Sequence, residues 1–438
     1  MDQALLEAAV ARMLGPGGDV QGLKRLTGGA NMESWSFDRD GQGYVLRRAP
    51  SAEMMAGRAY SHDVEAALIR LAHSHGVMAP EVLGELEPSD GLGSGYLMRR
   101  VEGTADPRIL LDGPAPELLD QLARELARIH EIPLTDLPSG LPQSDAGELV
   151  EALAARFEAH GGDRPVMALA LRWLRDHLPS PAQRVLLHGD FRIGNLMADD
   201  RGLTAVLDWE LAHIGDRHQD LAYGCINSWR FGRIDRPAFG MGQFEELFVA
   251  YERESRIAVE PARFRFWLVY STLWWGLTCL EMAEIWRSGR DRSLERVVIG
   301  RRASETEADL LMLLEEDAPE SERRAVDLPQ SPIVRRQGEP SQEELFEAVS
   351  EWIEQDLKPQ LSGRDRFQAN VALNALGMLK REGALPFDRT LSDDLLAGRA
   401  TLATPGLLAR LKRETLAKLA ADQPKYSALH AARARWSA

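Results

Sequence analysis

The first hundred residues combine two periodicities of hydrophobic and polar positions. Five short runs have the alternation and composition of strands: residues 23–26, 35–37, 44–47, 81–86 and 96–99. A Gly41-Gln42-Gly43 turn joins the second and third runs as a hairpin. Apolar residues with helical spacing precede the first run, and others follow the hairpin at 64–71. This pattern predicts a mixed lobe over residues 1–103 with the element order β-β-β-α-β-β after a short helix.

Residues 104–314 have mainly helical spacing. Six helices are expected here: 116–130, 147–158, 164–176, 243–253, 261–287 and 292–314. Three short strand-like runs lie between the third and fourth of them, at 185–187, 196–197 and 203–207. We therefore expect a helical lobe that carries a small β insert.

The most hydrophobic window, residues 266–280, is fifteen residues long, whereas a helix that spans a membrane needs about 20. The window contains Trp267, Trp274 and Trp275, and Glu281 follows it. An apolar helical stripe of this kind is typical of a protein core. The same tryptophans would also suit the wall of a pocket for an acyl chain.

The composition changes after residue 314. Residues 315–340 combine charged residues with four prolines and have no periodicity, which is typical of a linker. Residues 341–438 return to helical spacing. Ser341 to Glu344 has the pattern of a capping box, and Thr404-Pro405 has the order of a helix start. We expect an all-helical accessory domain over 341–438.

The bulk composition narrows the class of protein. A chain of 438 residues predicts two or three domains. The formal charge of -15 argues against a nucleic-acid partner, because such a protein needs basic surface to neutralise phosphates. Cys225 and Cys279 form no metal-binding or disulfide pattern, so reduced thiols are expected. With neither a basic, apolar leader nor a membrane span, we expect a cytoplasmic protein with no membrane partner; the oligomeric state is not visible.

One segment carries chemistry. Asp190 lies in the stretch 188–195, Asn195 follows five residues later, and Asp208 comes thirteen residues after that. Phosphoryl transfer needs a carboxylate that receives the proton of a hydroxyl, together with oxygen ligands that hold Mg²⁺ on the phosphates. We therefore predict Asp190 as the catalytic base and Asn195 and Asp208 as ligands of Mg²⁺. His188 and Asp220 are expected to brace the loop.

Protein kinases keep the same Asp-to-Asn spacing in H-R-D-x-x-x-x-N, followed by D-F-G. Here Gly189 replaces the arginine, and Asp208-Trp209-Glu210 replaces D-F-G. This variant resembles the aminoglycoside phosphotransferase family, the small-molecule branch of the kinase-like fold. The resemblance implies an α+β, two-lobed fold, with residues 1–103 as the N-lobe and 104–314 as the C-lobe, and ATP and Mg²⁺ as cofactors.

The resemblance also implies a nucleotide site. Gly28, Gly29 and Asn31 lie where the family has its nucleotide loop. Glycines suit such a loop, because they let backbone N–H groups approach phosphates closely. Arg47 occupies the position of the lysine in the kinase V-A-I-K motif and would clamp phosphates with its guanidinium. Glu65 on the following helix would pair with Arg47.

The strand that ends in Tyr96-Leu97-Met98-Arg99 resembles the family's hinge, where backbone groups near Arg99 and Val101 would hold adenine.

The acceptor is less clearly marked. Phe191-Arg192-Ile193-Gly194 resembles a subgroup of kinase domains associated with acyl-CoA dehydrogenases. That resemblance implies a hydroxyacyl-CoA acceptor, 4-hydroxyacyl-CoA in particular, and a pathway link to an acyl-CoA dehydrogenase-like enzyme. An arginine-rich stretch at 287–302 would suit the phosphates of CoA, or is an ordinary solvated helix face.

The accessory domain carries 14 basic and 13 acidic residues, a net charge of +1, whereas the rest of the chain carries a net charge of -16. Its basic residues suggest docking on an acidic face of the kinase; a surface that contacts CoA is the other interpretation. Two alternatives for the whole protein remain open. One is a kinase for another alcohol, such as an aminoglycoside, an amino alcohol or a sugar; the other is a non-catalytic pseudokinase scaffold.

Overall fold

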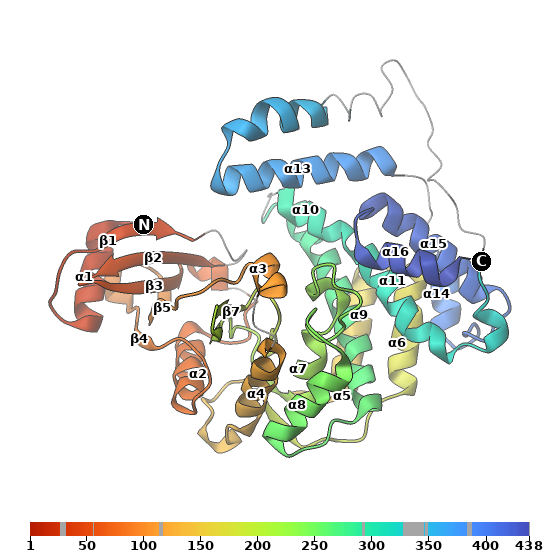
Figure 1. Ribbon diagram of the computed structural model, residues 1–438, viewed down its shortest axis with the longest axis horizontal. Coiled ribbons are helices and arrows are strands. Elements are labelled where there is room, and N and C mark those ends of the chain that lie inside the picture. The colour runs from red at the N-terminus through yellow and green to blue at the C-terminus, as the bar shows by residue number, and fades with distance from the viewer. Residues whose placement is uncertain are drawn as a thin grey trace.

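The computed structural model describes residues 1–26, 32–55, 57–113, 117–290, 294–326, 346, 349–382 and 388–437. Two lobes are visible in Figure 1: a β-sheet with flanking helices at the N-terminal end, and a larger helical body. The expected α+β, kinase-like arrangement is confirmed. None of the described helices is both long and apolar enough to cross a bilayer.

The N-lobe is built on one antiparallel sheet with the strand order β1-β2-β3-β5-β4. Its strands are β1 (Gln21–Arg25), β2 (Glu33–Arg39), β3 (Gln42–Ala49), β4 (Val82–Glu85) and β5 (Ser94–Arg99). The predicted hairpin pairs β2 with β3. Helix α1 (Gln3–Leu14) packs on the sheet and shares its small core, which includes Leu6, Phe37 and Leu46. Helix α2 (His62–Ser74) packs against β4 and β5.

The helical body begins with α3 (Pro107–Asp112), α4 (Leu118–Glu131), α5 (Ala146–Ala159) and α6 (Pro165–Asp176). Two two-stranded sheets follow. One pairs β6 (Arg184–Leu187) with β9 (His213–Asp216), and the other pairs β7 (Leu196–Asp199) with β8 (Gly202–Val206). Helix α7 (Arg217–Tyr223) and the single turn η4 (Asn227–Trp229) then lead to α8 (Phe244–Ser255) and α9 (Pro261–Arg287).

The predicted helix 292–314 is two helices, so that expectation was wrong. Helix α10 (Leu294–Arg301) ends at Arg301, and α11 (Ala303–Leu314) starts after Arg302. The break lets α11 lie between α9 on one side and the C-terminal helices on the other. Every residue of α11 from 303 to 311 is buried, because neighbours cover it all round.

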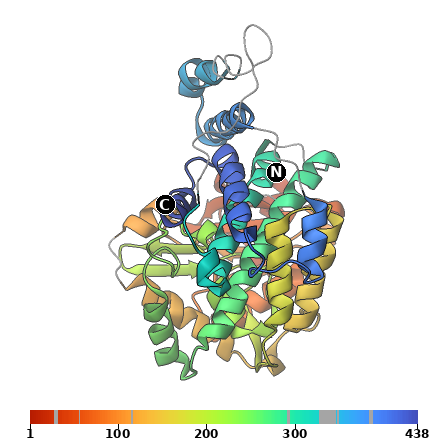
Figure 2. The same ribbon diagram turned by 90° about the vertical axis from the view of Figure 1, so that its right-hand side faces the viewer.

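The C-terminal region contains α13 (Gly363–Arg381), α14 (Arg389–Leu396), α15 (Leu407–Asp422) and α16 (Ser427–Trp436). Figure 2 shows α15 and α16 against the body, whereas α13 and the segment before it stand out from it. Helix α14 packs on α6, and α15 and α16 pack on α11. Buried residues of these helices, such as Leu408 and Trp436, belong to the same hydrophobic cluster as the C-lobe.

Two details of this region differ from expectation. Helix α15 starts at Leu407 after a left-handed Gly406, so Thr404-Pro405 lies in the preceding turn and does not cap the helix. The first part of the predicted linker, 315–326, contains two short 3₁₀ turns and buries Ala318 and Val326. The capping-box prediction at Ser341 lies outside the described residues. The domain boundaries at 103, 314 and 340 stay predictions.

Candidate active site

The catalytic loop is held by one buried carboxylate, Asp220 on α7. Its two oxygens accept the backbone N–H groups of His188 at 2.6 Å and Gly189 at 2.8 Å. Burial alone would raise the pKa of Asp220, but hydrogen bonding and the charge of His130, with the N–H of Gly189, lower it, so the carboxylate stays ionised. Gly189 is required, because its φ is +81° and a Cβ would lie 2.1 Å from the carbonyl oxygen of Leu211. The expected bracing role of Asp220 is confirmed.

His188 is also structural, as expected. Its Nε2 lies 3.1 Å from the carbonyl oxygen of Leu207, and its Nδ1 accepts the backbone N–H of Asp190 at 3.2 Å. Burial lowers the pKa of His188, which favours the neutral ring that these contacts need. Through this imidazole, the loop of Asp190 is joined to the residue before Asp208.

Asp190 sits at the centre of the site with both oxygens engaged. Arg192 Nε donates to its Oδ1 at 2.8 Å, and Asn195 Nδ2 donates to its Oδ2 at 2.5 Å. Burial raises the pKa of Asp190, the Arg192 guanidinium opposes that rise, and Asp208 adds to it. The hydrogens of the Asn195 amide thus turn toward Asp190, which leaves the amide oxygen as the end suited to a cation.

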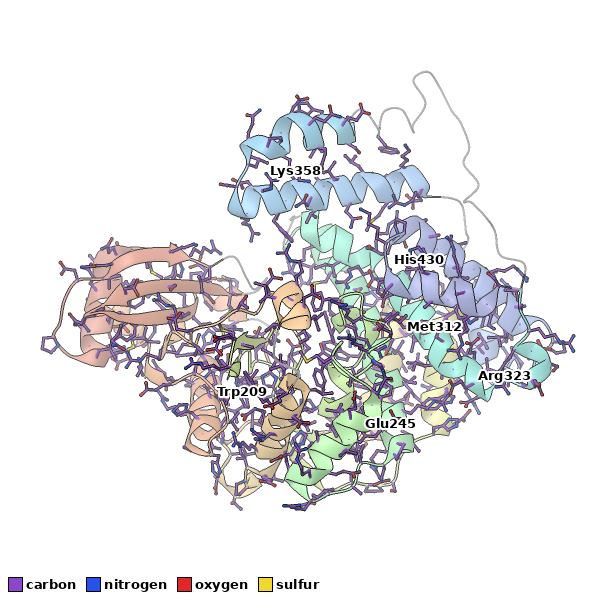
Figure 3. The ribbon with its side chains drawn as sticks, viewed as in Figure 1. Trp209, Glu245, Met312, Arg323, Lys358 and His430 are labelled. Atoms are coloured by element: carbon purple, nitrogen blue, oxygen red, sulfur yellow. The ribbon has the colours of Figure 1, made fainter. Side chains whose placement is uncertain are left out.

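Asp208 faces the N-lobe with a positive φ of +67°, an uncommon conformation for a residue with a side chain. Its Oδ1 accepts Arg47 Nη2 at 2.5 Å, so β3 of the N-lobe is tied to the segment after β8. Tyr60 strengthens this tie: its hydroxyl donates to the carbonyl oxygen of Trp209 and accepts the N–H of Ala212. Trp209, labelled in Figure 3, lies where the two lobes meet.

Five charged side chains form one cluster around Arg47, the interlobe cluster: Arg47, Arg58, Glu65, Asp208 and Glu210. Glu210 accepts Arg47 at 3.0 Å and Arg58 at 2.6 Å. Glu65 accepts Arg58 at 2.6 Å and lies 3.8 Å from Arg47, so the expected Arg47–Glu65 pair is present. Three carboxylates thus meet two guanidinium groups, and burial together with Asp208 raises the pKa of Glu210.

This cluster fits a metal-bound triphosphate. The excess carboxylate favours an additional cation, and Mg²⁺ is commonly held by one or two protein ligands together with substrate phosphates. The described residues contain no group of three or more His, Cys, Asp or Glu side chains arranged to hold a metal. Asp208 and the amide oxygen of Asn195 are oxygen donors of the kind that Mg²⁺ prefers. Nε atoms of Arg47 and Arg58 are buried and meet no hydrogen-bond acceptor in the described parts of the chain.

The other predicted nucleotide residues are placed less completely. Arg99 ends β5, and its N–H donates to the carbonyl oxygen of Glu81 at 2.9 Å. Its side chain stacks over Tyr44 on the lobe surface, so any adenine contact would have to come from backbone groups beyond this N–H. Val101 follows the strand, and no backbone hydrogen bond joins it to another described segment. Gly28, Gly29 and Asn31 lie outside the described residues.

An aromatic wall stands on the other side of Asp190. Its members come from α7, η4 and α9: Tyr223, Trp229, Trp274 and Trp275. The Arg192 guanidinium stacks over the Trp229 ring at 4.2 Å. Burial, followed by the Asp190 carboxylate, raises the pKa of Tyr223 far above its ordinary value, so its hydroxyl remains a proton donor beside that carboxylate.

The tryptophans of α9 divide into two roles. Trp267 is fully buried and donates to Asp216 at 3.0 Å, as a core residue would. Trp274 and Trp275 are only partly buried and face Tyr223 and Trp229. The core interpretation therefore holds for Trp267, while the other two lie on the side of the catalytic loop.

The arginine-rich stretch does not form an open phosphate site where it is described. Arg301 pairs with Asp422 at 2.6 Å and Glu382 at 2.7 Å, and Arg302 pairs with Glu305 at 3.0 Å. Arg296 is buried and donates to the sulfur of Met282. These three guanidinium groups thus have partners within the chain; the choice between CoA phosphates and a solvated helix face for the whole stretch stays a prediction.

A cavity of about 490 Å³ lies where α8, α9 and α11 meet α16. Its walls are largely apolar, with Phe244, Phe248 and Phe264, and they include the polar side chains of Asn227 and Asp309. None of the residues predicted to bind ATP, metal or the acceptor proton lines it. Glu245 and Met312, two lining residues, are labelled in Figure 3.

Four contributors were missing from the prediction: Arg58, Glu210, Arg192 and Tyr223. Arg192 and Glu210 lie inside the two motifs, so their positions were a usable signal. Tyr223 directly follows Asp220-Leu221-Ala222, another recognisable segment. Arg58 is different, because it lies in a loop without a motif and meets Glu210 from 152 residues away.

Comparison with known proteins agrees with this architecture. The model of the phosphotransferase enzyme family matches residues 22–262. A Ralstonia eutropha crystal structure assigned to the aminoglycoside phosphotransferases has a TM-score of 0.59 at 22% identity, covering 72% of this chain and 98% of that one. A thermostable mutant of aminoglycoside phosphotransferase APH(4)-Ia, in ternary complex with AMP-PNP and hygromycin B, has a TM-score of 0.50 at 22% identity, covering 72% and 99%.

Two curated relatives carry another name. Acyl-CoA dehydrogenase family member 10 of Mus musculus is 32% identical over 193 residues, covering 42% of this chain and 18% of that protein. Acyl-CoA dehydrogenase family member 11 of Gallus gallus is 29% identical over 304 residues, covering 62% and 38%. The chain thus spans less than two fifths of the length of either relative.

A sheet-based N-lobe followed by a helical lobe that carries the catalytic loop, together with the family match, makes the chain a kinase-like small-molecule phosphotransferase. Because the family model covers more than half of its residues, the chain belongs to the phosphotransferase enzyme family.

Proposed function

We propose that the protein is an ATP- and Mg²⁺-dependent kinase that phosphorylates a hydroxyl group of a small molecule, with a hydroxyacyl-CoA, 4-hydroxyacyl-CoA in particular, as the favoured acceptor. The observation that carries this proposal is the placement of Asp190. Its carboxylate lies between Arg192 and Asn195, with the interlobe cluster on one side and the aromatic wall on the other.

In the proposed reaction, the acceptor oxygen attacks the γ-phosphorus of ATP, the bond to the β-phosphate oxygen breaks, and ADP leaves. Asp190 orients the hydroxyl and receives its proton. Its pKa, raised by burial, makes it a better proton acceptor than an exposed aspartate. Arg192, 2.8 Å from Asp190, adds fixed positive charge close to the transferred group, where charge stabilisation has the most effect.

The nucleotide would lie between the lobes. Asn195 and Asp208 would hold Mg²⁺, which when bound neutralises the charge that develops on the phosphates. Arg47 and Arg58 would release part of their contact with Asp208 and Glu210 and donate to phosphate oxygens. Glu65 keeps the two arginines in place from α2, while Gly28, Gly29 and Asn31 would cover the phosphates. Backbone groups near Arg99 and Val101 would hold the adenine.

Two observations support an acyl thioester as the acceptor. The aromatic wall lies beside the base, and two of its rings, Trp274 and Trp275, are only partly buried; a hydroxylated acyl chain is apolar apart from its hydroxyl. In addition, both curated relatives carry the name of acyl-CoA dehydrogenase family members. We infer a pathway link to an enzyme of that type, which would act on the phosphorylated product, because phosphate is a better leaving group than the hydroxide of the free alcohol.

A panel experiment tests the proposal. The full chain is incubated with ATP, MgCl₂ and one acceptor at a time: 4-hydroxyacyl-CoA, 3-hydroxyacyl-CoA, hygromycin B, an amino alcohol or a hexose. ADP formation and the mass of the product are measured. We expect one phosphoryl group to be added to the 4-hydroxyacyl-CoA. If only hygromycin B or another alcohol is phosphorylated, that compound replaces hydroxyacyl-CoA as the proposed acceptor. Absence of Mg²⁺-dependent ATP binding would instead favour a non-catalytic pseudokinase scaffold.

The role of Asp190 is tested in the same assay. Asp190→Asn should lower kcat by about 10²- to 10⁴-fold, the range for loss of a general base, while ATP binding measured by calorimetry stays within a few-fold. Asp200→Asn, the same change on an exposed turn, is the matched control and should leave kcat unchanged. Turnover by Asp190→Asn at the rate of the control would refute the assignment of the base.

A further inference from the structure

The C-terminal helices reach the catalytic loop through a short chain of contacts. Tyr426, the residue that precedes α16, donates its hydroxyl to Asp309 Oδ2 at 2.5 Å. Asn227 Nδ2 donates to the other oxygen of Asp309 at 2.9 Å. Asn227 opens the single turn η4, which ends at Trp229, and the Trp229 ring supports Arg192 at 4.2 Å. Arg192 in turn donates to Asp190.

The side chains in this series of contacts have little freedom to move. The turn η4 is closed by hydrogen bonds from the N–H of Trp229 to the carbonyl of Ile226 and from the N–H of Arg230 to that of Asn227. Asn227, Ser228 and Trp229 are all buried. A displacement of the Asn227 side chain therefore moves the Trp229 ring, because both belong to one turn with no slack between them.

A second contact connects α11 to the same ring. The Arg302 guanidinium, which pairs with Glu305 of α11, lies 5.7 Å from the centre of the Trp275 ring. Trp275 contacts Trp229 with ring centres 4.5 Å apart. Trp229 is thus positioned from two points of the helix on which α15 and α16 pack. Figure 3 shows Met312 of α11 and His430 of α16 in this part of the body.

We propose that the C-terminal helices are a positioning element of the active site: through Tyr426, Asp309, Asn227 and Trp229 they fix the orientation of Arg192 and, through it, the carboxylate of Asp190. The part of this proposal that concerns turnover rests on the proposed function, because it takes Asp190 as the base. The part that concerns the order of the loop does not. Tyr426, Asp309 and Asn227 are positioning residues, since each acts through another side chain.

The proposal predicts which step of the reaction responds. Loosening Arg192 misplaces the base but leaves the interlobe cluster intact, so kcat should fall while the KM for ATP stays constant. Hydrogen exchange in residues 188–195 should rise at the same time, because Arg192 holds the Asp190 carboxylate. A helix that only adds stability would move neither quantity.

The test uses the full chain with Tyr426→Phe and Asp309→Asn as variants. Lys412→Met is the matched control, because Lys412 makes a buried bond of the same junction, to Glu315 at 2.8 Å, without touching Asn227. Hydrogen–deuterium exchange followed by mass spectrometry reports on residues 188–195 and 224–231. Relative to the rest of the protein, we expect faster exchange in both segments for the first two variants and unchanged exchange there for the control.

Turnover is measured with the best acceptor of the panel, or as ATP hydrolysis with MgCl₂ if none is found. The two positioning variants should lower kcat about three- to tenfold, which is modest for a misplaced catalytic group, with the KM for ATP within about twofold. Equal exchange in all three variants, or no change in either segment, would overturn the proposal. Faster loop exchange with unchanged turnover would retain the structural connection and instead contradict the role of Asp190 as base.

Discussion

The molecule has two clusters of carboxylates and basic side chains that differ in their charge balance and in their access to solvent. The interlobe cluster sets three carboxylates against two arginines, and the side chains of Asp208 and Glu210 keep more than a fifth of their surface exposed. The second cluster surrounds α11, where Glu305, Glu307, Asp309 and Glu315 are buried. Its cations are Arg302, Lys418, Lys412 and Arg435.

The difference shows how one type of interaction serves two purposes. Around α11, each of these carboxylates has its own cation or hydrogen-bond donor, and removing one partner leaves a buried charge uncompensated. Between the lobes there is one carboxylate too many, and the cluster is reached by solvent. That arrangement allows the arginines to exchange carboxylate contacts for phosphate contacts when nucleotide and metal bind, and to regain them when these leave. The expected docking of basic C-terminal residues on an acidic kinase face is confirmed for Lys418, which pairs with Glu307. Lys412 and Arg435 pair with Glu315, the first residue after the predicted C-lobe.

The largest effect should come from Asp208→Asn. Loss of a predicted Mg²⁺ ligand should lower kcat by about a thousandfold or more, in the range of preorganised charge stabilisation. Because the interlobe cluster has excess negative charge, the same change should leave the melting temperature unchanged or slightly higher. Activity assays and thermal unfolding of the same preparation check both. A clear loss of stability would contradict the contrast between the clusters.

Lys412→Met should have the next largest effect, this time on stability. It leaves Glu315 buried with Arg435 as its remaining cation, so the cost should approach, without exceeding, the value of about 3 kcal/mol for a buried carboxylate that loses its only cation. Chemical denaturation measures this loss. Turnover per folded molecule should match that of the wild type at temperatures where the variant is folded. The exposed pair of Arg389 and Glu158 offers a control, since Arg389→Gln should cost less than about 1 kcal/mol.

Arg58→Gln should have a smaller effect, on nucleotide binding. Arg58 bridges Glu65 and Glu210, so its loss should raise the KM for ATP about tenfold, the equivalent of about 1.4 kcal/mol, with kcat less affected. Arg48→Gln is the control, because Arg48 lies on the opposite face of β3 and contacts Glu33. Equal changes in the KM for ATP in the two variants would mean that the ATP phosphates do not bind beside Arg58.

The last expected effect is a pH dependence of stability at Asp309. Burial raises the pKa of this carboxyl to about 7, although Tyr426, Asn227 and Arg230 oppose the shift and Glu305 adds to it. A carboxyl whose pKa is higher in the folded state stabilises fully below its unfolded value of about 4, and that contribution is lost as the pH rises to about 7. Asp309→Asn should flatten the melting temperature between pH 5 and 7. If the melting temperature of the variant depends on pH as steeply as that of the wild type, the pH dependence arises from other groups.

The sequence predicted the parts of the fold that depend on local pattern. The N-lobe strands and α9, whose bounds match the structure, have clear periodicity and turn residues. Helix α7 and strand β9 were missed because each is short and lies between stronger signals. The break between α10 and α11 has no proline and no turn residue at Arg302. It arises from the position of α11 between two layers of helices, which no local pattern records.

The candidate site shows the same division. Asp190, Asn195 and Asp208 follow from motif spacing, and the structure brings the first two into direct contact. Arg58 and Tyr426 act through contacts over more than a hundred residues, so nothing near them in the sequence announces a role. Charge counting predicted the acidic face that receives Lys418, but it could not show the partners of Arg301 and Arg302, which lie on other helices or a turn away.

The burial of α11 on all sides has a consequence for synthesis. A ribosome releases α11 before α15 and α16, so its carboxylates must stay hydrated until Lys412, Lys418 and Arg435 have emerged. We expect the C-lobe to remain partly open until residue 436 has left the exit tunnel. A nascent chain that stalls before α16 should therefore be a substrate for chaperones and proteases even though every motif residue of the catalytic loop has already been made.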